Sequence, residues 1–214
     1  CLLAGLVAAC SPPEPKTEGA PRQLRRLTET QYRNSIADIF GADIKIVGRF
    51  EPIVRPRMEL IAVGTALAAI SPAGFEQYDA MARGIAKQVV DEAHRATLLP
   101  CAPKDAKAAD ADCARAIFTA LGRQLLRRPL KDEETDALVK VAEASTKNMG
   151  DFYAGASMGL AGLLSSPHFL FRVENVETDS AGKSQLDGYS KAARLSYFLW
   201  NTAPDERLLV AAEK

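Results

Sequence analysis

DFYAGASMGLAGLLSSPHFLFRVE, residues Asp151–Glu174, is the longest weakly charged run outside the first ten residues of this 214-residue chain. Large apolar residues recur in it at helical spacing, and small residues fill the other face, where neighbouring helices can approach closely. The apolar stripe consists of Phe152, Ala156, Gly159, Leu160, Leu163 and Leu164. We expect a helix that Asp151 caps, that ends near Ser165–Ser166 before Pro167, and that lies in the middle of a helical bundle. Its apolar part, Phe152–Leu164, is too short to cross roughly 30 Å of hydrocarbon.

The composition is ordinary for a soluble globular protein, with 47% apolar and 25% charged residues, and it is sufficient for a real core. Lys and Arg together number 27, as do Asp and Glu, so the chain lacks the basic excess of a nucleic-acid-binding protein. Aromatic residues make up only 7%, which argues against a base-stacking surface and against a sheet-rich fold. We therefore predict a mainly α protein that does not bind nucleic acid.

The first ten residues, CLLAGLVAAC, have the apolar character and the small-residue ending of the second half of a signal peptide. Val7–Cys10 resembles a bacterial lipobox, which implies that Cys10 becomes the lipid-bearing mature amino terminus. A plain secretory signal and a buried helix are the alternatives. Residues 11–21 are rich in Pro, Glu, Lys and Gly, so we expect a disordered tether there. We expect an exported protein, lipid-anchored in the periplasm or at the outer membrane, and a chain that is a fragment at both ends.

Two further cysteines, Cys101 and Cys113, flank a polar segment that we expect to be a loop. An exported compartment oxidises thiols, so we predict a disulfide that stabilises the fold by about 2–3 kcal/mol in the chain-entropy model. A zinc site is the alternative, but the chain has no CxxC and only two histidines, His94 and His168. CxxCH is also absent, so this segment holds no covalent c-type haem.

Signals for helix ends recur along the chain. Thr28–Gln31 has the form of a capping box and predicts a helix that ends at Gly41. Ser71-Pro72 predicts the next start. Its expected buried stripe is Phe75, Tyr78, Ala82, Ile85 and Val89. Further helices are expected over Ala114–Arg127 and Lys131–Lys147, after Asp187, and from Pro204–Leu209.

The segments between these helices read as loops. Ala42–Ala69 contains prolines and clustered arginines and predicts a long irregular loop, either one side of a ligand cleft or simple packing across the bundle end. Ile44, Ile46 and Val47 allow a short strand within it. Residues 175–185 are polar and turn-rich, so we expect a surface loop. The predicted fold is an irregular multi-helix bundle with a long loop after the first helix.

Four segments resemble signatures of one group of proteins. They are RRLTETQYRNSIADIFG (Arg25–Gly41), GRQLLRRPLKDEE (Gly122–Glu134), LLSSPHFLFRVE (Leu163–Glu174) and LDGYSKAARLSYFLWNTAPDERLL (Leu186–Leu209). They occur in this order in large exported bacterial proteins that carry the planctomycete-cytochrome-associated domains, families of unknown function. Two departures are Lys131, where relatives usually place a capping Thr, and Arg49–Arg57, which replaces an Asp- and Asn-rich segment.

The resemblance implies an organisation of the chain. After the signal remnant at 1–10 and the tether at 11–21, it implies an amino-terminal helical domain at 22–100. An Arg-Arg-Pro-Leu domain at 101–174 and the start of a third domain at 175–214 follow. Many relatives carry a c-type haem module beside these domains, so haem would reach this chain only from another domain or a partner. The family supplies no catalytic residues to carry over.

Two residues near the end of the quoted stretch are candidates for a functional role. His168 follows the helix-breaking Pro167, with Arg172 nearby, and its imidazole suits a haem or metal ligand or a general base. The alternative is a packed residue that hydrogen-bonds the backbone, because no second histidine or cysteine stands at ligand spacing. We assign no catalytic residue and no metal ligand.

Arginines form two further candidates. Arg127-Arg128 either binds an anion or caps backbone carbonyls and pairs with Asp132 or Glu133. The entry to the first helix is also basic, which indicates either a docking patch or solvated charge. Its arginines are Arg22, Arg25, Arg26 and Arg33.

The sequence leads to two hypotheses about function and leaves open whether the protein is an enzyme. The first is a non-enzymatic, lipid-anchored protein of the cell envelope that binds a partner protein or an envelope polymer. The second is a domain of a periplasmic redox system that serves a c-type haem protein.

Overall fold

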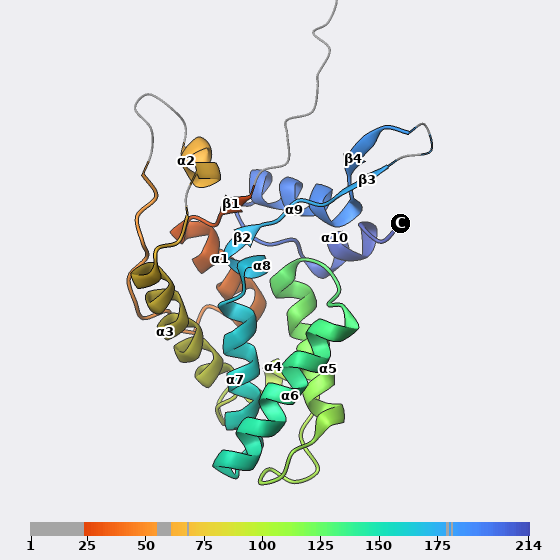
Figure 1. Cartoon of the computed structure of the whole chain (residues 1–214). Coiled ribbons are helices and arrows are strands. Elements are labelled where there is room, and N and C mark those ends of the chain that lie inside the picture. The colour runs from red at the N-terminus through yellow and green to blue at the C-terminus, as the bar shows by residue number, and fades with distance from the viewer. Residues whose placement is uncertain (1–23, 55–60, 68, 179, 181) are drawn as a thin grey trace, which may run out of the picture.

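The computed structural model describes residues 24–54, 61–67, 69–178, 180 and 182–214, which contain ten helices and two small sheets (Figure 1). The mainly α prediction is therefore confirmed. Cys10 and the predicted tether lie outside the described residues, so their assignments stay predictions. Among the helices of the described ranges, none has both the length and the apolar character that a membrane span requires.

The first half of this part of the chain contains β1 (Arg25–Arg26), α1 (Glu29–Phe40), α2 (Ile61–Leu67), α3 (Pro72–Val89), α4 (Arg95–Leu98) and α5 (Ala111–Leu126). The second half contains α6 (Asp132–Met149), α7 (Phe152–Leu164), α8 (Pro167–Leu170), β2 (Phe171–Arg172), β3 (Val176–Thr178), β4 (Ser184–Leu186), α9 (Gly188–Leu199) and α10 (Glu206–Ala211).

Helix α7 packs against α3, α5 and α6, and its predicted ends are confirmed. Asp151 caps it by accepting hydrogen bonds from two amide groups in the first turn, and Ser165 ends it. Its glycines allow close contact: a Cβ at Gly155 would lie 2.5 Å from the Ala142 carbonyl of α6, and one at Gly159 would overlap the ring of Phe118. The expectation that α7 is enclosed on every side is wrong at Gly162, which is exposed.

One hydrophobic core joins the helices before and after residue 100. At its centre the Tyr32 ring of α1 lies 5.2 Å from both Phe50 and Phe169, measured between ring centroids. Phe50 belongs to the long loop after α1, whereas Phe169 belongs to α8. Side chains from both sides of the predicted boundary thus pack together, while the division into domains stays a prediction.

Two short antiparallel strand pairs lie at the end of the molecule that carries α9. Strands β1 and β2 are antiparallel, with Arg25 opposite Arg172, and the Leu27 amide donates a hydrogen bond of 2.9 Å to the Leu170 carbonyl. Strands β3 and β4 form an antiparallel hairpin where the sequence predicted a surface loop. The surface position is as expected, because β3 is exposed along its whole length. The strand pairing was missed because strands of three residues are too short to show an alternation of apolar and polar residues.

The predicted irregular loop is confirmed at residues 42–54, which a buried arginine holds. The prediction is wrong at Ile61–Leu67, which form α2, and residues 55–60 lie outside the described residues. Arg26 is 2% exposed, and its guanidinium donates to the Glu51 carboxylate and to the carbonyls of Glu51, Pro52 and Ala69, each at 2.9 Å. No strand forms at residues 44–47, and Val47 is 82% exposed. Phe75, predicted to be buried in α3, is 47% exposed.

The predicted disulfide between Cys101 and Cys113 is confirmed, with the two Cα atoms 5.8 Å apart. The loop that it closes leads into α5, whose cap is Asp110. The Asp110 carboxylate accepts hydrogen bonds from the amide groups of Cys113 at 3.0 Å and Lys104 at 3.1 Å, which folds the loop back on the helix start. These hydrogen bonds lower the pKa of the Asp110 carboxyl group.

Candidate functional site

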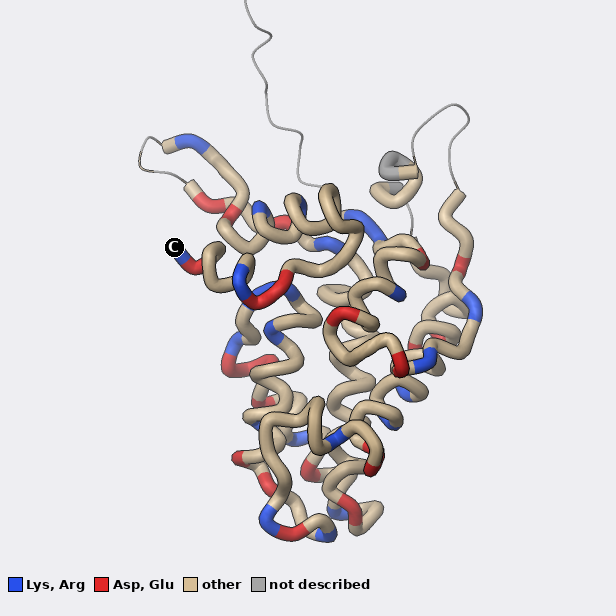
Figure 2. Tube along the Cα trace, turned by 180° about the vertical axis from the view of Figure 1, so that it is seen from behind, with Lys and Arg blue, Asp and Glu red and all other residues tan. Residues whose placement is uncertain are grey.

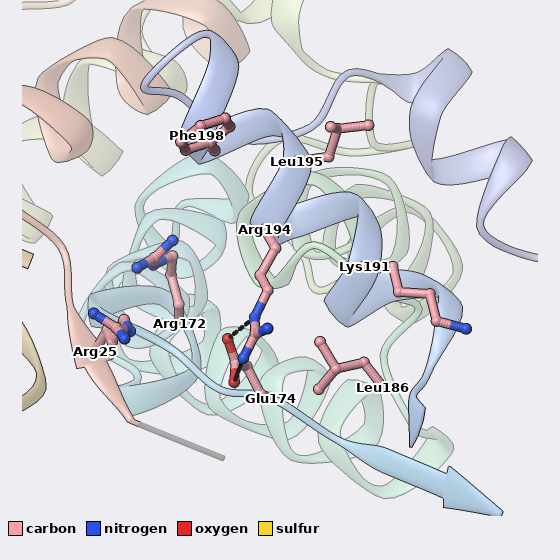
Figure 3. Close-up of a pocket in the computed structure, with 8 residues that line it drawn as sticks. All are labelled: Arg25, Arg172, Glu174, Leu186, Lys191, Arg194, Leu195 and Phe198. Carbon is pink, nitrogen blue, oxygen red and sulfur yellow. Dashed lines mark hydrogen bonds and ion pairs between the residues drawn. The ribbon is translucent and has the colours of Figure 1, made fainter. Parts of the chain in front are cut away.

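A groove of about 530 Å³ lies where β1, β2 and β4 meet α9, and Figure 3 shows its lining. We call it the arginine groove. It is lined by Arg25, Arg172, Glu174, Leu186, Lys191, Arg194, Leu195 and Phe198. Four of these side chains are cations and one is a carboxylate, although the whole chain has no net charge. Basic and acidic segments alternate along the described trace in Figure 2, so the positive charge of the groove is local.

The pairing of β1 with β2 brings two arginines together. Arg25 and Arg172 occupy directly opposed positions of an antiparallel pair, where side chains on one face are neighbours. Like charges in such positions repel and destabilise the pair. Burial lowers the pKa of Arg172, and the neighbouring charge of Arg25 lowers it further.

The Arg172 guanidinium lacks an ion pair within the described part of the chain. Its central carbon lies 5.4 Å from the ring centre of Tyr197. Its Nε atom is buried and makes no hydrogen bond to the described residues. A buried donor without a partner costs free energy, so this arginine is held at a cost that an anion in the groove would offset.

Glu174, Arg194 and Lys191 of the groove have polar partners. Glu174, whose side chain is 5% exposed, accepts two hydrogen bonds of 2.7 and 2.8 Å from Arg194. This pairing raises the pKa of Arg194. Lys191 donates to the Gln185 side chain at 3.1 Å, and its Nζ lies 3.9 Å from Glu177. Glu174 therefore fixes the Arg194 side chain on the floor of the groove.

Helix α9 forms the remaining wall of the groove. Asp187 caps this helix by accepting a 2.7 Å hydrogen bond from the Ser190 amide. The face turned to the protein carries mostly small side chains, namely Ser190, Ala192, Ala193 and Ser196, together with Tyr197. Larger apolar residues point the other way, and Phe198 is 84% exposed. The groove thus combines cations with an apolar side.

Tyr197 ties the α9 wall to the rest of the molecule. Its buried hydroxyl lies 3.3 Å from Ser35 Oγ of α1 and accepts a 3.3 Å hydrogen bond from Arg127 Nη1. Ser35 Oγ in turn accepts from the Ala203 amide at 3.2 Å. One buried network therefore joins α1, the end of α5 and α9.

The arginine pair after α5 has a structural use. Arg127 ends α5 with a left-handed backbone (φ 59°), and its guanidinium donates to the carbonyls of His168 and, at 2.8 Å, Phe171. Arg128 pairs with Glu134 through hydrogen bonds of 2.7 and 2.8 Å. Capping and pairing are thus the correct alternatives, although the partner is neither Asp132 nor Glu133.

Glu134 also closes the start of α6. The Lys131 amide donates a 2.8 Å hydrogen bond to its carboxylate, which supplies one half of a capping box. Arg128 and this amide lower the pKa of Glu134 to about 2. Lys131, which departs from the family's usual cap, therefore does not leave the helix start unsupported.

His168 and Arg172, the two residues singled out from the sequence, are not brought into one site. Arg172 lines the groove, whereas His168 lies on α8 beside Arg128. The half-buried position of His168 and the nearby Arg128 lower its pKa. Among the described residues, no three His, Cys, Asp or Glu side chains are grouped to hold a metal ion.

Sequence reasoning left open whether Arg25 belongs to a docking patch and singled out Arg172. It missed Lys191, Arg194 and Phe198 as parts of the same site. Their spacing on α9 was available as a signal: Lys191 and Leu195, and likewise Arg194 and Phe198, are four residues apart and share a face. The pairing that brings Arg25 to this helix has no local signal.

Three family models match the chain. PSD3, described as a protein of unknown function (DUF1587), matches residues 25–91. PSD5, described as a protein of unknown function (DUF1595), matches residues 113–174, and PSD4, with the corresponding description (DUF1592), matches residues 186–214. No curated protein and no solved structure matches this chain. The four quoted motifs fall within these ranges in the expected order, so the resemblance is confirmed.

Proposed function

Because the chain carries the planctomycete-cytochrome-associated domains DUF1587, DUF1595 and DUF1592 in this order, families without an assigned activity, we propose a function from the site alone. The protein is a binding module of the cell envelope, exported and anchored by a lipid on Cys10. Its arginine groove binds an anionic group of a partner protein or an envelope polymer.

The observation that carries this proposal is the pair Arg25 and Arg172. Two guanidinium groups on opposed positions of one strand pair repel each other, and Arg172 Nε is buried without a hydrogen-bond partner among the described residues. A carboxylate or phosphate group in the groove offsets the repulsion, because a planar guanidinium donates parallel hydrogen bonds to such anions. The charge of Glu174 also favours protonated Arg172, but the Glu174 carboxylate makes its hydrogen bonds to Arg194.

The apolar side of the groove indicates the form of the ligand. Leu186, Leu195 and Phe198 line the groove together with the arginines. Burying apolar surface contributes about 25 cal/mol per Å², so a ligand with an apolar or ring-shaped body beside its anionic group gains from both sides. An inorganic anion has no apolar body, so it gains only from the contacts with the arginines.

Titration of the full chain, carrying Cys10→Ser to prevent acylation, with soluble polyglutamate tests this proposal. We expect binding that weakens as salt rises, and an Arg172→Gln variant that binds about ten-fold more weakly, as loss of one charge-assisted hydrogen bond predicts. Lys140→Gln, on the exposed face of α6, is the matched loss of one charge and leaves affinity unchanged. Equal affinity of Arg172→Gln and the unsubstituted groove would refute the proposal.

The second candidate is a domain of a periplasmic redox system. It is supported by the cytochrome-associated character of all three matched domains. The absorption spectrum of the protein, purified from a host that exports proteins and matures c-type cytochromes, separates the two candidates. A Soret band that copurifies with the chain would favour the redox role and contradict the first proposal as stated, while a colourless protein supports the binding module.

A further inference from the structure

We propose that the arginine groove and the outer face of α9 dock on an anionic lipid surface. This inference rests on the anion-binding groove of the proposed function, but it takes phosphate-bearing lipid headgroups, rather than a protein or a polymer, as the source of the anion. We define the α9 outer face as Lys191, Arg194, Leu195, Phe198 and Leu199.

Apart from Tyr197, the large apolar residues of α9 point away from the protein, whereas in a helix that only packs on a core they would point inward. Its protein-facing side consists mostly of alanine and serine. Leu195, Phe198 and Leu199 are instead exposed, Phe198 at 84% and Leu199 at 54%. Contiguous exposed apolar patches mark interaction sites with membranes or proteins. This face is therefore built to contact something outside the described residues.

Charge selects the kind of partner. The patch is continuous with the groove, because Leu195 and Phe198 belong to both, and the groove adds Arg25 and Arg172 to the cations of α9. Helices that lie in the headgroup region of a bilayer combine Lys and Arg with Phe and Leu in this way.

The point where the chain enters the fold agrees with a lipid surface. Strand β1 lies beside α9 (Figure 1), and its first residue, Arg25, lines the groove. In the sequence, 14 residues separate Cys10 from Arg25, and an unfolded linker of that length has a typical span of about 20 Å. A lipid on Cys10 would therefore hold this face, rather than the opposite end of the bundle, near the membrane.

The same charges argue against a second copy of this chain as the occupant. A symmetric dimer through this face would place the four groove cations of one subunit near those of the other, and like charges repel. An anionic bilayer presents phosphate groups at the level of the cations and hydrocarbon below them, which matches the two parts of the face.

Trp200, the residue after Leu199 at the end of α9, lies next to the outer face and provides the measurement, because it is the only tryptophan of the chain. The full chain with Cys10→Ser is mixed with phosphatidylglycerol vesicles, with phosphatidylcholine vesicles, or with soluble glycerol phosphate. We expect a blue shift of Trp200 emission and cosedimentation with phosphatidylglycerol vesicles only. Phe198→Ser and Lys191→Gln should each weaken vesicle binding by about five-fold, since each removes one surface contact.

A matched control lies on another face: Lys140→Gln with Val141→Ser on α6 removes one exposed cation and one exposed apolar residue, and it leaves vesicle binding unchanged. Equal binding to both vesicle types, no blue shift, or a dimer that Phe198→Ser dissociates would overturn the inference. Binding of polyglutamate without binding of vesicles overturns the membrane inference and leaves the anion-binding groove standing. Loss of both kinds of binding rejects the groove itself.

Discussion

Arg127 donates a hydrogen bond of 3.3 Å to the hydroxyl of Tyr197, and both side chains are buried. Arg127 lies in the segment that matches DUF1595 and Tyr197 in the one that matches DUF1592. Ser35, 3.3 Å from the same hydroxyl, lies in the segment that matches DUF1587. The three segments are thus joined at one polar point, and this point positions α9 as a wall of the groove.

Replacing Tyr197 with Phe should destabilise the fold. The change leaves a donor of Arg127 and the Ser35 hydroxyl without their shared partner, which costs about 1–3 kcal/mol in a buried site. Urea unfolding followed by circular dichroism measures this loss. Tyr189→Phe is the control, since its hydroxyl bonds the exposed Glu213, and it should have a smaller effect. Equal losses in the two variants would contradict the role given to Tyr197.

Replacing Tyr32 with Phe should leave stability unchanged or increase it. The Tyr32 hydroxyl is buried and makes no hydrogen bond within the described residues, and burial raises the pKa of this group well above its usual range. Removing an unsatisfied hydroxyl while keeping the ring removes a desolvation cost. The same unfolding assay checks the change. A loss above about 1 kcal/mol would mean that the hydroxyl has a partner after all.

Removing the disulfide should destabilise the protein without changing its fold. Cys101→Ser with Cys113→Ser is expected to lose about 2–3 kcal/mol of unfolding free energy, because the unfolded chain regains the freedom of the closed loop. Unfolding of the unsubstituted protein with and without reductant provides the comparison. If reductant does not shift its midpoint, the bond is not formed in the protein.

His94 should make part of the stability depend on pH. Its ring nitrogens lie 2.7 Å from Asp91 and 3.0 Å from Asp43, and the hydrogen bond to Asp91, with a smaller effect of Asp43, raises its pKa. Because the pKa of His94 is higher in the folded protein than in the unfolded chain, protonation of its ring stabilises the fold. This stabilisation is complete below the ordinary histidine pKa of about 6.5, and it disappears as the pH rises through the pKa of the folded state.

Comparing melting temperatures of the unsubstituted protein and His94→Gln tests this dependence. The variant should be less stable at about pH 6, and the difference should shrink at about pH 9. Asp43→Asn, which removes the more distant carboxylate, should have a smaller effect in the same direction. A difference that grows with pH would reverse the sign and rule out the proposed protonation of His94.

Local chemistry made much of the bundle predictable. Asp151 marks the start of α7 because its carboxylate caps amide groups of the first turn. Pro167 marks the end because proline has no backbone N–H to continue the helix. Cys101 and Cys113 were predictable because their chemistry depends on compartment and spacing. Phe75 was misplaced because its position on the stripe of α3 says nothing about whether another element covers the first turn of that helix.

The groove was less predictable, for a physical reason. Arg25 and Arg172 are brought together by the pairing of two short strands that are far apart in the chain. Strands of two residues are too short to show a periodic pattern of apolar residues, so the sequence does not predict this pairing. Phe198 has the spacing of a core residue, so only the finished packing of α9 reveals that it points outward. The site depends on tertiary contacts, whereas the helices that carry it depend on local signals.

The central claim is that Arg172 receives an anion in the arginine groove, and its Nε–H resonance reports on this directly. We would record ¹⁵N–¹H spectra of the arginine side chains while adding polyglutamate. The account predicts that the Arg172 Nε–H signal moves, while that of Arg115, which pairs with Asp136 on α6, stays in place. An Arg172 signal that does not move while polyglutamate binds would contradict the account, because binding would then occur elsewhere on the molecule.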